Sequence, residues 1–282
     1  MQWGRAAKVN WLNECSDASP MALTLPWTLG LVAMLAYTAA TWPRPVRSRW
    51  PEAALAIGWV AHAGTLVLDV IGWGSPQPGA RFGFAPALSA TVWLVLAVHS
   101  VESRFVPQPG VRRALALAGA VVVVLATALP GTARPHAGSP WLPLHWLFGL
   151  VAYGLFAMAV LHAWMLDAAE RRLRGGAGLA AGGGLPLLWL ERVTFRFVEI
   201  GFAVLSAALL LGWLLTDDWR WGHKNVLSLL AWATFAVLIG GRHWRGWRGR
   251  QATRWIYAGA LLLLLAYVGA RFVLEIVLQR PA

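Results

Sequence analysis

Apolar residues run in long blocks along this 282-residue chain, separated by short segments rich in proline, glycine and arginine. The blocks are about 17–25 residues long, and a helix needs roughly 20 apolar residues to cross about 30 Å of hydrocarbon. They lack the period-2 alternation of β-barrel strands. We therefore predict membrane-spanning helices over residues 22–42, 52–71, 85–101, 113–130, 142–166, 196–215, 224–241 and 255–278.

A chain segment surrounded by lipid must satisfy its backbone hydrogen bonds internally, which favours helices. The predicted fold is thus an all-α integral membrane protein, a polytopic bundle of about eight transmembrane helices. Composition agrees, because 58% of the residues are hydrophobic and only 13% are charged, against about a quarter charged in soluble domains. We interpret residues 22–278 as one transmembrane domain. Residues 1–21 form a polar N-terminal tail, and both Met1 and Met21 remain open as the native start.

Positive charge indicates the orientation of the bundle. Of the 24 lysine and arginine residues, 16 fall in or beside the loops on one side of the predicted spans. Because cytoplasmic loops carry the excess of lysine and arginine, this side is the predicted inner side and both termini are predicted to lie outside. Topology accounts for the net charge of +12, and no nucleic-acid partner is expected.

Ionisable side chains within the spans are the first functional candidates, because they are costly in lipid. His62 lies near the middle of the second span, with Thr65 and Asp69 on roughly the same helical face. A neutral imidazole at this depth ligates a metal, relays protons or simply hydrogen-bonds a neighbouring helix. His145 begins the fifth span, where Gly149 on its face permits close approach of another helix or a flat ligand.

The predicted outer end carries further candidates. Trp219 and Trp221 lie just before His223 in the sequence WRWGH (219–223), and they form either a stacking platform for a flat aromatic ligand or an interfacial anchor. Arg271 shares a face of the last span with Glu275. It is either neutralised by Glu275 or binds an anionic group such as a carboxylate.

At the opposite end, His99, His162 and His243 are interpreted as interfacial residues, and Glu199 is expected to pair with Arg192 or Arg196. The chain shows none of the familiar catalytic motifs, so we expect a binding protein and no enzyme. Its single cysteine excludes multi-cysteine metal sites and covalent attachment of a c-type haem.

Several segments resemble, in order, the cytochrome c assembly family of membrane proteins (the CcsA/CcmC/HemX group), most of all its small YpjD/HemX-like branch. The strongest are HKNVLSLLAWATFAVLIGGRHWRGWRGR (223–250) and AYVGARFV (266–273). AHAGTL around His62, LHWLFGLVAYGLFAMAVLHA around His145 and LERVTFRFVEIG (190–201) support the resemblance. Gly222 stands where the family has an aspartate after the second tryptophan, and no histidine follows His243.

The resemblance implies a multi-pass protein of the bacterial inner (cytoplasmic) membrane that handles haem at the outer leaflet. It implies haem b as cofactor, with His62 and His145 as candidate iron ligands and cytochrome c maturation or haem-synthesis proteins as partners. A non-haem accessory protein that influences tetrapyrrole synthesis is the alternative, and a small-solute transporter is a third hypothesis. The remaining candidate haem contacts are His223, Trp219, Trp221 and Arg271.

Overall fold

The computed structural model describes residues 20–42, 50–73, 80–104, 108–134, 141–175, 187–216 and 221–273. The predicted tail over residues 1–21 therefore lies almost entirely outside the described residues. In chain order the elements are α2 (Pro20–Thr41), α3 (Trp50–Ile71), β1 (Ala80–Phe82), α4 (Phe84–Glu102), α5 (Pro109–Ala128), β2 (Thr132–Arg134), α6 (Leu142–Arg174), α7 (Leu187–Leu214), α8 (His223–Arg245), α9 (Gly249–Leu264), η1 (Leu265–Gly269) and α10 (Ala270–Phe272).

The predicted multi-pass helical architecture is confirmed. Among the described residues, seven helices are long and apolar enough to cross a membrane, and α2 adds another helix of 22 residues. The largest difference from the predicted spans is the start of α7, which begins at Leu187 although its apolar run begins near residue 196. Within this added stretch, Glu191 is neutralised by arginines from other segments.

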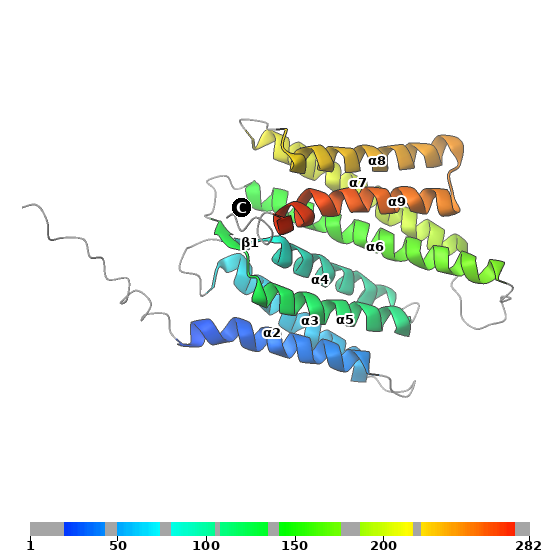
Figure 1. Ribbon diagram of the computed structural model, residues 1–282. Helices are drawn as coiled ribbons and strands as arrows, with labels where there is room; N and C mark the ends of the chain where they lie inside the picture. Colours follow the sequence, from blue (N-terminus) through cyan, green and yellow to red (C-terminus); the bar gives the residue numbers. More distant parts are fainter. Residues whose placement is uncertain are drawn as a thin grey trace, which may run out of the picture.

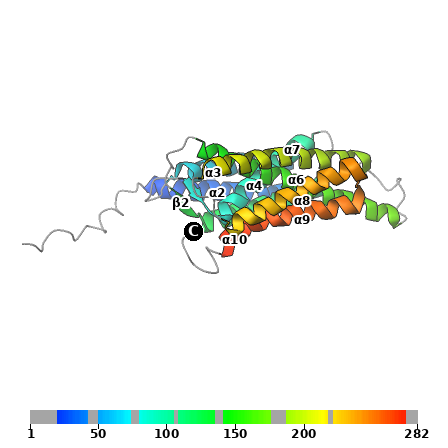
Figure 2. The same ribbon diagram turned by 90° about the horizontal axis from the view of Figure 1, so that it is seen from above.

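The helices form two halves that lie side by side (Figures 1 and 2). One hydrophobic core joins α2, α3, α4 and α5, around buried residues such as Tyr37 and Leu96. A second core joins α6, α7, α8 and α9, where the rings of Phe156 and Phe235 stack with centroids 3.8 Å apart. The halves meet where α4 packs against α6 and η1. Lipid-facing side chains such as Val60 and Leu210 remain exposed.

A small two-stranded sheet lies at one end of the bundle, where sequence patterning predicted only loops. β1 and β2 are antiparallel, with Ala80 opposite Arg134 and Phe82 opposite Thr132. Strands of three residues are too short to show a period-2 pattern. The sheet ties the α3–α4 connection to the α5–α6 connection at the end where α2 begins and α10 ends (Figure 1). This is the predicted outer end.

Candidate functional site

His62 lies at the centre of a closed polar cluster in the first half of the bundle. Its side chain is fully buried. Nδ1 lies 3.1 Å from the hydroxyl of Tyr37 on α2, and Nε2 lies 2.7 Å from the hydroxyl of Ser89 on α4. In either tautomer one ring nitrogen donates and the other accepts. Both nitrogens are therefore engaged, so iron ligation by His62 requires that Tyr37 or Ser89 release its hydrogen bond.

The ring of Tyr37 is held between two glycines. A Cβ atom built on Gly58 of α3 would lie 2.7 Å from Cδ1 of this ring, and one on Gly119 of α5 would lie 2.9 Å from Cε2. The glycines thus let α3 and α5 approach the ring from both sides. Asp69, expected on the face of His62, forms an ion pair with Arg81 at 3.7 Å instead.

His145 is oriented differently, at the predicted outer end of the second half. Its Nδ1 lies 2.9 Å from the carbonyl oxygen of Ala208 on α7. A carbonyl only accepts, so Nδ1 carries the proton and Nε2 keeps a free lone pair. Nε2 has no hydrogen-bond partner among the described residues. Gly212, one turn beyond Ala208, lies under the ring, since its Cβ would come 2.8 Å from Cε1 of His145.

Metal-binding histidines nearly always donate the proton of the second ring nitrogen to a carbonyl or carboxylate, which fixes tautomer and orientation. His145 has this arrangement. On α6 one turn further along, a Cβ at Gly149 would meet nothing within 4 Å. The face of α6 at Gly149 is thus open, and the close approach of a flat ligand to His145 stays a prediction.

Aromatic and basic residues surround this end of α8. Trp221 is 73% exposed, and His223 and Lys224 begin the helix on the surface. The ammonium of Lys224 lies 5.8 Å from the ring centroid of Tyr267, within the π-helical turn η1. Trp219 and the side chain of Arg271 lie outside what the structure describes, and their predicted roles stay predictions.

The structure does not bring His62 and His145 together. The partners of His62 come from α2 and α4, whereas His145 bonds to α7, and the two residues belong to different halves. A single haem held between both histidines is therefore not the arrangement seen here.

The interpretation of His99 and His162 as interfacial residues was wrong, because both are almost fully buried. They lie on α4 and α6, where the two halves meet. Nε2 of His162 is 3.2 Å from Oε2 of Glu102, at an angle that makes no hydrogen bond. Nε2 of His99 and Nε of Arg112 are also buried without a hydrogen-bond partner. Sequence reasoning missed this cluster because each residue lies close to the end of a predicted span, where water was assumed.

Comparison with known proteins identifies the family. Residues 48–278 match the family described as Cytochrome C assembly protein. The chain belongs to this family. The match covers most of both halves, including His62, His145 and the start of α8.

Curated relatives agree with this assignment. The chain is 30% identical over 159 residues to the inner membrane protein YpjD of Escherichia coli, covering 55% of this chain and 60% of YpjD. It is 26% identical over 197 residues to the cytochrome c biogenesis protein CcsA of a Synechococcus strain, covering 58% of this chain and 63% of CcsA. A 28.8 kDa protein of Azospirillum brasilense is 27% identical over 82% of this chain and 88% of its own length. No solved structure matches.

Proposed function

We propose that this protein binds haem b noncovalently beside His145 and serves as a haem-handling protein of the inner membrane in cytochrome c biogenesis. Family membership and the similarity to a protein named for cytochrome c biogenesis support the process. Similarity to a protein named for the inner membrane supports the location. The observation that carries the haem assignment is the hydrogen bond from Nδ1 of His145 to Ala208, which leaves Nε2 available.

The residues near His145 fit the chemistry of haem. Nε2 of His145 would hold the haem iron, and the bound haem would supply a redox-active metal. The ammonium of Lys224 offers a positive charge for a propionate. Trp221 exposes a large aromatic surface at the same end, and the open space at Gly149 admits a flat ring system. His62 contributes to stability in this proposal, because both of its nitrogens are engaged within the protein.

The test is a titration of purified protein in mild detergent with hemin, monitored by the Soret band. Wild type is compared with His145→Ala and with His243→Ala. His243 is a close control, because its Nδ1 also bonds a backbone carbonyl, that of Ile239 at 3.1 Å, on an exposed part of α8 at the other end. We expect His145→Ala to abolish stoichiometric binding and His243→Ala to leave it unchanged. Equal binding by both variants would refute the assignment of His145.

The non-haem accessory function is the second candidate, favoured by the closed hydrogen bonding of His62. It predicts a protein that takes up no hemin in this titration. It also predicts a partner protein that remains associated after gentle solubilisation.

A further inference from the structure

The end of the bundle opposite His145 carries a basic pocket of about 300 Å³ between α7 and α8. Three arginines, one glutamate and one phenylalanine form its lining, namely Arg192, Arg196, Arg242, Glu199 and Phe195. We propose that this pocket binds the phosphate headgroup of an anionic phospholipid, best a lipid with two phosphate groups. The proposal is independent of haem binding.

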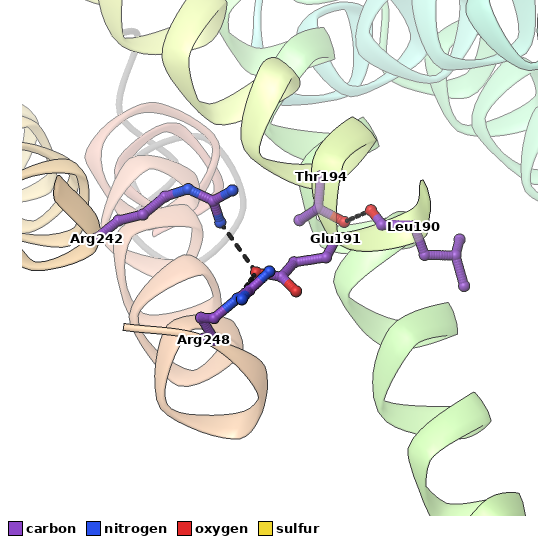
Figure 3. Close-up of polar contacts among 5 residues, drawn as sticks. All are labelled: Leu190, Glu191, Thr194, Arg242 and Arg248. Atoms are coloured by element: carbon purple, nitrogen blue, oxygen red, sulfur yellow. Dashed lines mark hydrogen bonds and ion pairs between the residues drawn. The ribbon is translucent and has the colours of Figure 1, made fainter. Parts of the chain in front are cut away.

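One side of the pocket is held rigid by an ion-pair network (Figure 3). Glu191 on α7 accepts hydrogen bonds from Arg242 of α8 at 3.2 Å and from Arg248, just before α9, at 2.8 Å. The guanidinium carbon Cζ of Arg242 also lies over the ring of Phe195, 3.4 Å from its centroid. These contacts place Arg242 in the pocket wall with a fixed orientation, and a guanidinium has five donors to share.

Positive charge is in surplus there. The pocket and its ion-pair network hold two carboxylates, those of Glu191 and Glu199, and four guanidinium groups, those of Arg192, Arg196, Arg242 and Arg248. Two positive charges are therefore left uncompensated. The expected ion pair of Glu199 with Arg192 or Arg196 is not found. Within the described part of the chain, none of these three residues joins an ion pair. Arginine recognises phosphate oxygens through paired hydrogen bonds.

The depth of the pocket suits a lipid headgroup. With 28 residues, α7 is about 42 Å long at 1.5 Å per residue, whereas the hydrocarbon core is about 30 Å thick. The surplus of about 12 Å places the charged first turns of α7 at headgroup level. One turn deeper in the span, Ile200 lies on the same face of α7 as Arg196 and exposes 52% of its surface. An acyl chain can pack against it.

These features favour a lipid over a soluble acidic protein. The pocket has room for a headgroup, and the exposed apolar side chain of Ile200 follows it along α7. Basic pockets between transmembrane helices on the cytoplasmic side are a recurrent form of recognition for lipids with multiple phosphates. The excess of lysine and arginine in the loops at this end predicts that it faces the cytoplasm.

The test is native mass spectrometry of delipidated protein in detergent micelles. The probes are cardiolipin, phosphatidylethanolamine and inorganic phosphate. We expect wild type to retain cardiolipin over phosphatidylethanolamine, and excess inorganic phosphate to leave cardiolipin bound. The variant Arg192→Gln/Arg196→Gln should bind cardiolipin about tenfold more weakly or worse.

The control variant is Arg171→Gln/Arg172→Gln, which also removes two positive charges. Both arginines are exposed in the last turn of α6, at the same end of the bundle as the pocket. It should bind cardiolipin like wild type, and thermal unfolding should show that both variants are folded. Equal weakening in both variants would mean diffuse attraction and would overturn the proposal. Displacement by inorganic phosphate would overturn the lipid assignment in favour of a free anion.

Discussion

Gly212→Ala is the sharpest perturbation of the proposed haem contact, because it removes none of the side chains that would touch haem and acts only on the position of the His145 ring. The new methyl carbon would lie 2.8 Å from Cε1 and 3.2 Å from Nδ1 of His145. The ring must move, which strains the hydrogen bond of 2.9 Å to the carbonyl of Ala208. Overpacking of this kind costs about 1–3 kcal/mol. Loss of such a bond behind a ligating histidine weakens metal binding by about 10–100-fold.

The assay is the hemin dissociation constant of Gly212→Ala, measured together with its thermal unfolding midpoint. Gly110→Ala is the control, because a Cβ there meets nothing within 4 Å. We expect weaker hemin binding by about 10–100-fold for Gly212→Ala and no change for Gly110→Ala. Unchanged hemin affinity in a folded Gly212→Ala protein would refute the view that the orientation of His145 matters.

Two further predictions concern stability, each measured as the unfolding midpoint by tryptophan fluorescence. Gly58→Ala should destabilise the first half by about 1–3 kcal/mol, because the new methyl would press on the clamped ring of Tyr37, whereas Gly64→Ala meets only a flexible leucine end and should be milder. Equal midpoints for these two variants would contradict the clamp. Glu191→Gln should lower the unfolding midpoint, because it weakens the charged hydrogen bond to Arg242, which contributes about 1.5–3 kcal/mol. An unfolding midpoint equal to that of wild type would contradict a stabilising role for Glu191.

The sequence predicted the helices well because hydrophobic length alone decides whether a segment spans a membrane. It predicted the start of α7 poorly, since Glu191 and Arg192 interrupt the apolar run. Glu191 is neutralised by Arg242 and Arg248, which lie 51 and 57 residues further along the chain and leave no local signal.

Candidate residues were found by their cost in lipid, but that cost does not reveal their partners. His62 was predicted because it is a polar group at mid-depth, and only the fold shows that Tyr37 and Ser89 satisfy it. The orientation of the His145 ring likewise depends on its hydrogen bond to Ala208, 63 residues further along the chain. Which nitrogens are engaged is a property of helix packing, and spacing within one helix does not encode it.

The haem content of the purified protein tests the central claim most directly. Wild type and His145→Ala are expressed with ample haem, purified in mild detergent and analysed by the pyridine haemochrome assay. The account predicts a stoichiometric b-type spectrum for wild type and its loss in His145→Ala. A colourless wild type that also takes up no added hemin would contradict it.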